Sequence, residues 1–270
     1  MRACAYDTGV HPRNDDPMTA LIETIDHDGA IREVKLARPP VNALNPALCR
    51  ALRDAIDAAG ADGVGGVVLS GGPKVFSAGL DVPYLLTLDG RDVLKAAWED
   101  FFTAARALAD APMPVVAAIA GHAPAGGCVL ALCCDYRIMA SGPFRIGLNE
   151  TQVGLVAPEG IQHLLRRVVG AHRGERLLVS GELVEAEHAL ALGLVDELAD
   201  IDHVAVRARA WLAELLQLPR QPVLRTRAIA RADLVDALRP ERIQLDRFID
   251  SWSEPDTQAG LRALVTKLGK

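Results

Sequence analysis

The sequence has few cysteines, and none of them forms a CxxC pair. Their number, five, is odd. A disulfide framework and a zinc site are therefore both disfavoured. Free cysteine is among the most buried residue types, so three of the five are expected to be reduced thiols in the core, namely Cys128, Cys133 and Cys134.

Several catalytic patterns are missing as well. The seven histidines lack the spacing of metal ligands, so no metal is expected. Neither G-x-G-x-x-G nor G-x-x-x-x-G-K-[ST] occurs, and the G-x-S-x-G elbow of many hydrolases is absent. Ser77 lies near a glycine turn but has no evident base partner in the sequence. His122 lies near another such turn, where we expect a packing or solvent-edge role.

The chain has no basic surplus and no long apolar run. Its formal net charge is -6 and its pI is about 5.7, whereas a surface for nucleic acid or anionic membrane needs clustered Lys and Arg. No apolar run approaches the roughly 20 residues that span a bilayer, and the N-terminus lacks an export pattern. We therefore expect a cytoplasmic protein without a nucleic-acid partner or membrane insertion.

What the chain does have is alternating apolar blocks. Half of its 270 residues are apolar, as in a soluble globular protein. Residues 1–17 show no period and are interpreted as a disordered leader. Strands are predicted at residues 20–25, 31–36, 64–69, 115–119 and 136–140, with helices at 46–59, 91–109 and 127–134. This alternation is typical of an α/β fold.

The pattern changes after about residue 204. No strand signal remains there, and Ala, Leu and Arg recur at helical spacing almost to the C-terminus. We expect residues 18–204 to form a core domain with the active site. Residues 205–270 should form a helical subdomain that packs on this core and on neighbouring subunits.

Two glycine-rich turns carry the first chemical signals. Residues 75–81, VFSAGLD, follow a predicted strand, and small residues there let a backbone N–H face a ligand. The alternative is an ordinary loop in which Asp81 caps the next helix. Residues 119–128, IAGHAPAGGC, lead a strand through a turn into a helix, whose first N–H groups and positive dipole end favour an anion in front of them.

Together the two turns resemble those of the crotonase family, the enoyl-CoA hydratase and isomerase superfamily, over about residues 20–268. The resemblance implies an α/β, crotonase-like (ClpP/crotonase) ββα spiral core with a C-terminal helical subdomain, assembled as a homotrimer or homohexamer. It also implies that the N–H groups of Leu80 and Gly126 form an oxyanion hole for the enolate of an acyl-CoA thioester. No cofactor is implied, because coenzyme A is part of the substrate.

Three stretches narrow the resemblance to the mitochondrial-type Δ3,Δ2-enoyl-CoA isomerase branch. They are residues 124–128, PAGGC, residues 134–138, CDYRI, and residues 147–154, GLNETQVG. In the last stretch Glu150 matches the glutamate that hydratases and isomerases share. Asn149 either orients Glu150 or bonds local backbone.

The other acidic positions of the family are vacant here. The second glutamate of hydratases falls at Val129, and the aspartate of dienoyl-CoA isomerases falls at Pro158. Hydration needs two carboxylates to activate a water, whereas moving a double bond needs one base that carries a proton from C2 to C4. The residues therefore favour an isomerase of β-oxidation with Glu150 as its base, provided that an apolar surrounding raises the pKa of Glu150.

Glu159 leaves alternatives open. Its carboxylate could supply a second acid and restore enoyl-CoA hydratase chemistry, or it could simply be the acid that the first turn of a helix opened by Pro158 favours. A third alternative is a non-catalytic scaffold or RNA-binding homologue, which the acidic charge balance and an intact Glu150 disfavour.

The resemblance assigns the binding of coenzyme A to two loops. The matching residues are Asn42, Ala43 and Leu44 in the first loop and Ala78, Gly79 and Asp81 in the second. The first loop also has the pattern of a helix start. Lys267 is a weak candidate for the phosphates. Trp98, Phe101 and Phe102 could line an acyl slot, although aromatics at helical spacing more often belong to the core.

Overall fold

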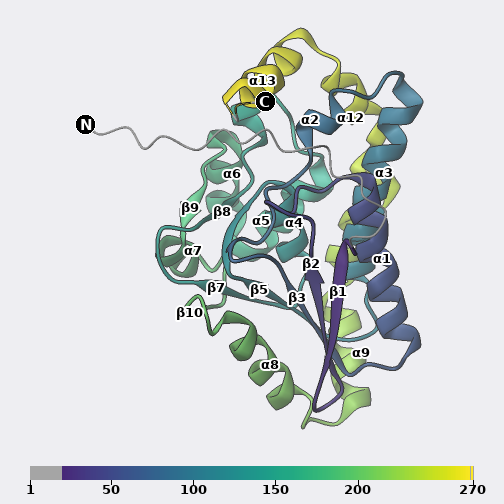
Figure 1. The fold of residues 1–270 in the computed structure, drawn as a ribbon, viewed down its shortest axis with the longest axis vertical. Coiled ribbons are helices and arrows are strands. Elements are labelled where there is room, and N and C mark those ends of the chain that lie inside the picture. Colours follow the sequence, from purple (N-terminus) through teal and green to yellow (C-terminus); the bar gives the residue numbers. More distant parts are fainter. Residues whose placement is uncertain (1–19, 268, 270) are drawn as a thin grey trace.

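The computed structural model describes residues 20–267 and 269. Among these residues, the main sheet has six strands, shown in Figure 1. Their order is β1-β2-β3-β5-β7-β10. Strands β1 and β2 are antiparallel, and the other neighbours are parallel. The strands are β1 (Ile22–His27), β2 (Ile31–Leu36), β3 (Gly66–Ser70), β5 (Val115–Ile119), β7 (Tyr136–Ala140) and β10 (Glu197–Ala199). The leader expected at residues 1–17 lies outside the described residues.

A second, smaller sheet was not predicted from the sequence. Its order is β4-β6-β8-β9, and its strands are β4 (Lys74–Val75), β6 (Gly121–Pro124), β8 (Arg145–Gly147) and β9 (Val184–Glu185). The interpretation of the stretch before Gly126 as a turn is therefore wrong for β6. Strands of two to four residues are too short to show an alternation of apolar and polar residues. The strands also approach closely at Gly121, where a methyl group would lie 1.9 Å from the Lys74 carbonyl carbon.

The two sheets are connected by a repeated path. A strand of the main sheet leads directly into a strand of the small sheet and then into a helix. This happens at β3-β4-α2 (α2, Val82–Leu85), at β5-β6-α4 (α4, Gly126–Leu132) and at β7-β8, which continues into the 3-10 helix η1 (Glu150–Val153) and α5 (Glu159–Val169). The path is the ββα spiral that the resemblance implies. It places three strand-to-helix connections next to one another.

Alternate residues of the buried strands face two different cores. Val67 and Leu69 of β3 belong to the larger cluster, which includes residues of α1 (Pro46–Ala61) and α3 (Arg91–Ala109). Val68, between them, belongs to a second cluster on the other face, where it joins Leu212 of α8 (Val204–Leu215). Helices therefore cover both faces of the main sheet (Figure 1), as expected for parallel strands.

From Val204 onward the described residues form helices only. These are α8, α9 (Arg220–Ala230), α10 (Ala232–Ala237), α11 (Pro240–Ile243), α12 (Leu245–Trp252) and α13 (Pro255–Lys267). Helix α12 packs on α3, and α13 packs on η1 and α2. The remaining helices, α6 (Ala171–Ser180) and α7 (Ala186–Leu192), precede this region. In the described part of the chain, no helix is both long enough and apolar enough to cross a membrane.

Candidate active site

Leu80 presents a backbone N–H that its neighbours leave free. The residue forms a parallel bridge with Leu44. In that bridge the Leu44 N–H donates to the Gly79 carbonyl at 2.8 Å, and the Leu44 carbonyl accepts from the Asp81 N–H at 3.0 Å. The peptide N–H of Leu80 therefore points to the opposite side, and within residues 20–267 it has no hydrogen-bond acceptor.

The second free donor is the N–H of Gly126, the first residue of α4. Such an N–H has no partner inside its own helix, and no acceptor for it is found within residues 20–267. Ala125 precedes it with φ 47° and ψ -119°, an uncommon conformation for a residue with a side chain. Its own N–H donates to the Gly147 carbonyl at 2.8 Å, which anchors the peptide directly before the one that carries the Gly126 N–H.

Glycines bring the two donors together. A Cβ atom placed on Gly79 would lie 3.1 Å from the Gly126 nitrogen, and one placed on Gly127 would lie 2.6 Å from the Ser77 carbonyl oxygen. Gly79 also has φ 82°, which side chains rarely adopt. The loop before α2 and the start of α4 are thus in backbone contact, and their two unpaired N–H groups are neighbours. Such a pair can stabilise a developing oxyanion.

Glu150 begins η1, three residues after Gly147, the β8 residue that accepts the Ala125 N–H. Its side chain is half-buried. Desolvation raises the pKa of Glu150 to about 7, against an ordinary value of 4.5, although a hydrogen bond from its own backbone N–H opposes the shift. A carboxyl with a pKa near neutrality is suited to accept and return a proton. No side-chain hydrogen bond from Asn149 to Glu150 is found within residues 20–267.

The two further positions at which the resemblance places acids are apolar here. Val129 lies in α4 and is 2% exposed. Pro158 caps the N-terminus of α5. Desolvation raises the pKa of the Cys128 thiol, and the charge of Glu150 raises it further. Cys128 is therefore a neighbour of the Glu150 carboxyl. Cys128, Cys133 and Cys134 are buried and free, which confirms the prediction for them.

Glu159 has a different environment from Glu150. It is exposed in the first turn of α5, where its carboxylate accepts from Arg166 at 2.8 Å and from Arg242 at 2.7 Å. Desolvation alone raises its pKa, but the hydrogen bonds and charges of Arg242 and Arg166 outweigh it and lower the pKa of Glu159. These contacts favour the helix-start role. The role of a second acid stays a prediction.

The two loops expected to bind coenzyme A lie side by side. The Ala78 N–H donates to the Val41 carbonyl at 2.9 Å, and the buried Asn42 amide donates to the Phe76 carbonyl at 3.0 Å. Ala43 and Leu44 complete the first loop, while Asp81 caps α2 by accepting from the Tyr84 N–H at 3.2 Å. The cap predicted at Asp81 is confirmed. Ser77, fully buried, donates to the Asn42 carbonyl at 2.8 Å and so supports the loops rather than acting as a nucleophile.

A family model described as enoyl-CoA hydratase/isomerase matches residues 26–269. The chain belongs to this family. Mouse (Mus musculus) mitochondrial enoyl-CoA delta isomerase 1 is 34% identical over 254 residues, covering 92% of this chain and 86% of the relative. A probable enoyl-CoA hydratase of Mycolicibacterium paratuberculosis is 36% identical over 239 residues, covering 87% and 92%.

Solved structures of the family have the same fold. The crystal structure of human mitochondrial delta3-delta2-enoyl-CoA isomerase superposes with a TM-score of 0.87 at 30% identity, covering 92% of this chain and 98% of that one. The crotonase-like fold expected from the sequence is thereby confirmed. The chain is an enzyme of the enoyl-CoA hydratase/isomerase family, which acts on acyl-CoA thioesters.

One residue that holds the two loops together, Arg38, was not predicted from the sequence. Arg38 donates to the Ala43 carbonyl at 2.8 Å and pairs with Asp81 at 2.8 Å, so it ties the first loop to the second. Its backbone N–H donates to the Asn42 side chain at 2.9 Å. The only available signal was an arginine directly before Pro39-Pro40, and a lone arginine does not reveal a partner that lies 43 positions further along the chain.

The remaining residues that the sequence suggested for binding have packing or surface positions in the structure. Trp98, Phe101 and Phe102 are buried, and Trp98 packs against Phe248 and Trp252 of α12, so the core interpretation is correct for them. The His122 ring accepts from the Arg145 N–H at 3.1 Å, as expected of a packing role. Lys267 is exposed at the end of α13. No cluster of potential metal ligands is found among the described residues.

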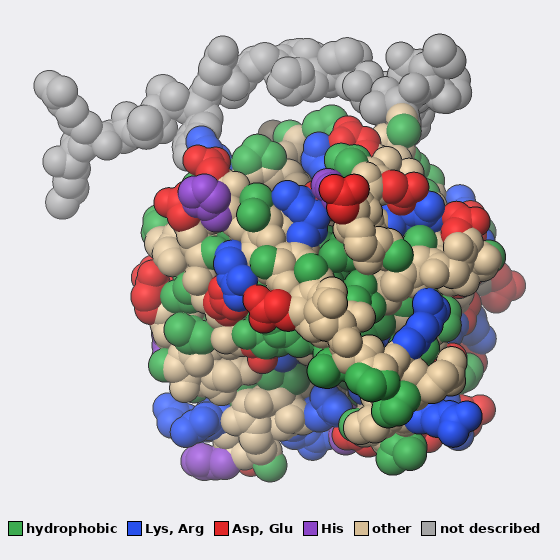
Figure 2. All heavy atoms as spheres, turned by 90° about the horizontal axis from the view of Figure 1, so that it is seen from below, with side chains coloured by type: hydrophobic (Ala, Val, Ile, Leu, Met, Phe, Trp, Pro, Cys, Tyr) green, Lys and Arg blue, Asp and Glu red, His purple; other side chains and the backbone are tan. Residues whose placement is uncertain are grey.

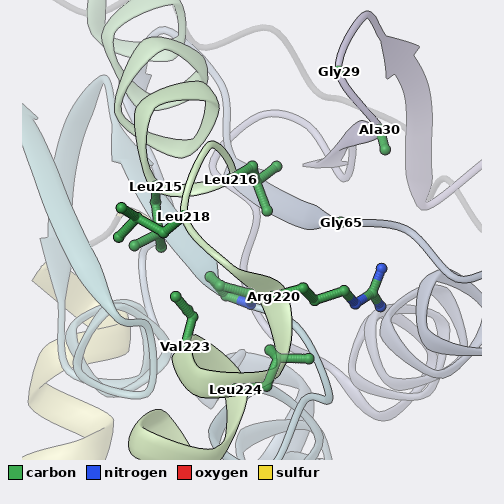
Figure 3. A pocket seen from close by; sticks show the side chains of 10 residues that line it. Gly29, Ala30, Gly65, Leu215, Leu216, Leu218, Arg220, Val223 and Leu224 are labelled. Atoms are coloured by element: carbon green, nitrogen blue, oxygen red, sulfur yellow. The ribbon is translucent and has the colours of Figure 1, made fainter.

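A separate cavity lies away from this family site. Figure 3 shows it between the turn at Gly29 and Ala30 and the connection from α8 to α9. Apolar side chains from that connection, including Leu216 and Leu218, line it. None of the predicted site residues belongs to its lining.

Proposed function

We propose that the chain is a Δ3,Δ2-enoyl-CoA isomerase, which converts a 3-enoyl-CoA to the trans-2-enoyl-CoA in fatty acid β-oxidation. The observation that carries the proposal is the contrast between Glu150 and its surroundings. Glu150 has a pKa raised to about 7, Val129 is buried and apolar, and Glu159 is held by two arginines. One carboxyl with two accessible protonation states is what a proton shuttle requires.

The proposed reaction uses three groups of the chain. The Glu150 carboxylate removes a proton from C2 of the 3-enoyl thioester, and the electron pair of the broken C–H bond extends the double bond into a dienolate. The Leu80 and Gly126 N–H groups hold the negative thioester oxygen. The neutral Glu150 then returns the proton to C4, the C2–C3 double bond forms, and the thioester carbonyl is restored. No water and no cofactor enter this cycle.

Enoyl-CoA hydratase is the second candidate, because a probable hydratase is among the similar proteins at 36% identity. The two activities are separated by assaying 3-hexenoyl-CoA and crotonyl-CoA with the same enzyme preparation. Isomerisation faster than hydration supports the proposal. Fast hydration of crotonyl-CoA, retained in the Glu159→Gln variant, would show that the chain hydrates without a second carboxylate at either position and would overturn it.

The non-catalytic alternative receives no support from the surface seen in Figure 2. On that face acidic and basic side chains are interspersed, without the clustered Lys and Arg that a nucleic-acid site needs. A Glu150→Ala variant with no measurable loss in either assay would instead favour a non-catalytic role.

A further inference from the structure

The position of Glu150 depends on helices that lie outside its own connection. Helix η1, which begins at Glu150, has no buried side chain of its own. On one side it touches the C-terminal end of α6, where Thr151 donates to the Leu178 carbonyl and Gln152 donates to the Ser180 carbonyl, both at 3.4 Å between exposed groups. These hydrogen bonds are long, but the packing is close, because a methyl group on the glycine that follows α6 would lie 2.5 Å from the Thr151 hydroxyl oxygen. Packing on α6 therefore bounds η1 on this side, and a short hydrogen bond holds it on the other.

Thr257 of α13 makes the short contact on that other side. Its side chain is buried, with 2% of the residue exposed, and its hydroxyl donates to the Gly154 carbonyl at 2.6 Å. Gly154 caps η1 with φ 77°, and its N–H donates to the Thr151 carbonyl at 3.2 Å. The next N–H, of Leu155, donates back to the Glu150 carbonyl at 2.9 Å. The carbonyl that Thr257 binds therefore belongs to the turn that closes on Glu150.

Helix α13 also meets this turn backbone to backbone. A methyl group on Gly260, one turn after Thr257, would lie 2.5 Å from the Val153 carbonyl oxygen. A methyl group on Gly154 would lie 3.1 Å from the Asp256 carbonyl oxygen. No side chain separates the two segments, so a small displacement of α13 is transmitted directly to η1.

We propose that Thr257 is a positioning residue for Glu150. Its hydroxyl holds the Gly154 carbonyl and thereby fixes the turn from which the Glu150 carboxylate reaches the substrate. The inference rests on the proposed function in that it takes Glu150 to be the base. Because the loops expected to bind coenzyme A have their own hydrogen bonds, loss of the Thr257 hydroxyl should affect the chemical step more than substrate binding.

The test compares Thr257→Val, which keeps the size but removes the hydroxyl, with Thr257→Ser, which keeps the hydroxyl. Thr266→Val is the matched control, since Thr266 lies on the same helix but is exposed and donates only within α13. A misplaced catalytic group costs up to about 100-fold in rate, so kcat of Thr257→Val should fall by about 10- to 100-fold with KM unchanged. Thr257→Ser should restore most of the rate, and Thr266→Val should match the unaltered enzyme.

Gly260→Ala provides a second variant that keeps the Thr257 hydroxyl. Its new methyl group must push α13 away from Val153, so kcat should fall here too, while thermal unfolding shows that the protein remains folded at the assay temperature. An unaltered kcat in Thr257→Val would overturn the proposal, as would a loss that Thr257→Ser does not restore. If Thr257→Val does not fold, Gly260→Ala decides, and its full activity overturns the proposal.

Glu150→Gln, assayed alongside, separates this inference from the proposed function. Full activity of Glu150→Gln with both substrates would show that Glu150 is not the base and would refute the proposed function. An inactive Glu150→Gln together with a fully active Thr257→Val would leave the base in place and refute only its positioning by Thr257.

Discussion

Gly126 lies directly against Leu80. A methyl group on Gly126 would come 2.6 Å from Cδ2 of Leu80, and 3.3 Å from the Gly79 Cα. The residues that carry the two unpaired N–H groups are thus packed on each other with no room for a side chain. The spacing of an oxyanion hole depends on this contact, because donors must lie within hydrogen-bond distance of one oxygen atom.

Substituting Gly126 should therefore separate the donors. Gly126→Ala forces the Leu80 side chain to move, and we expect kcat to fall by about 10- to 100-fold, as for a small misplacement of catalytic groups. Steady-state kinetics with 3-hexenoyl-CoA measures the effect. Gly72→Ala is the control, since its methyl group would meet its nearest neighbour at 3.4 Å, an ordinary contact, and should leave kcat unchanged. Equal rates for all three proteins would contradict the assignment.

The pH dependence of the rate should follow Glu150. The carboxyl accepts a proton only when ionised, and burial raises its pKa to about 7. We expect kcat/KM to rise as the pH increases through about 7 and to fall about tenfold per pH unit well below it. Glu150→Gln should lower kcat by about 10²- to 10⁴-fold and remove this dependence. An unchanged pH profile in the variant would place the base elsewhere.

The same group should make folding stability depend on pH. The pKa of Glu150 is higher in the folded chain, about 7, than its ordinary value of 4.5. The stabilisation is therefore fully present below pH 4.5 and is lost as the pH rises through 7. The shift corresponds to at most about 3 to 4 kcal/mol. Urea unfolding of the unaltered protein and of Glu150→Gln should show the difference between them changing in favour of the variant from pH 4 to pH 8, and a constant difference would contradict the raised pKa.

Much of the fold could be predicted from local patterns. Strands β2, β5 and β7 and helix α3 begin and end where the apolar periodicity predicts, because long regular elements bury a continuous face. Strand β1 begins two residues later than predicted. The small sheet was missed because strands such as Lys74–Val75 are too short for a period, and only pairing with other segments defines them.

The candidate site was also predicted only in part from the sequence. The motif residues Leu80, Gly126 and Glu150 could be selected from the sequence because their spacing resembles that of a family. The contacts that hold them could not be selected. Arg38 reaches Asp81 across the loop, and Thr257 reaches Gly154 from the other end of the chain. Such contacts join residues of ordinary type whose proximity arises only in the folded chain.

The C-terminal helices are joined to the core by Asp135. Its carboxylate accepts from Arg227 at 2.7 and 2.9 Å, pairs with Arg231 at 3.1 Å, and accepts from the Val115 N–H at 2.8 Å. Arg231 is 6% exposed, and its guanidinium also donates to the Cys133 carbonyl at 2.6 Å. The carboxylate thus compensates a buried positive charge.

Removing this carboxylate should be costly. In Asp135→Ala the buried Arg231 loses its counter-charge, and breaking a buried pair in this way typically costs about 3–5 kcal/mol. Urea unfolding should show the midpoint falling with little change in slope. Asp246→Ala is the control, because Asp246 is exposed and pairs with Lys95 on the surface, where an ion pair adds little. A similar small effect in both variants would mean that water, rather than Asp135, compensates the charge of Arg231.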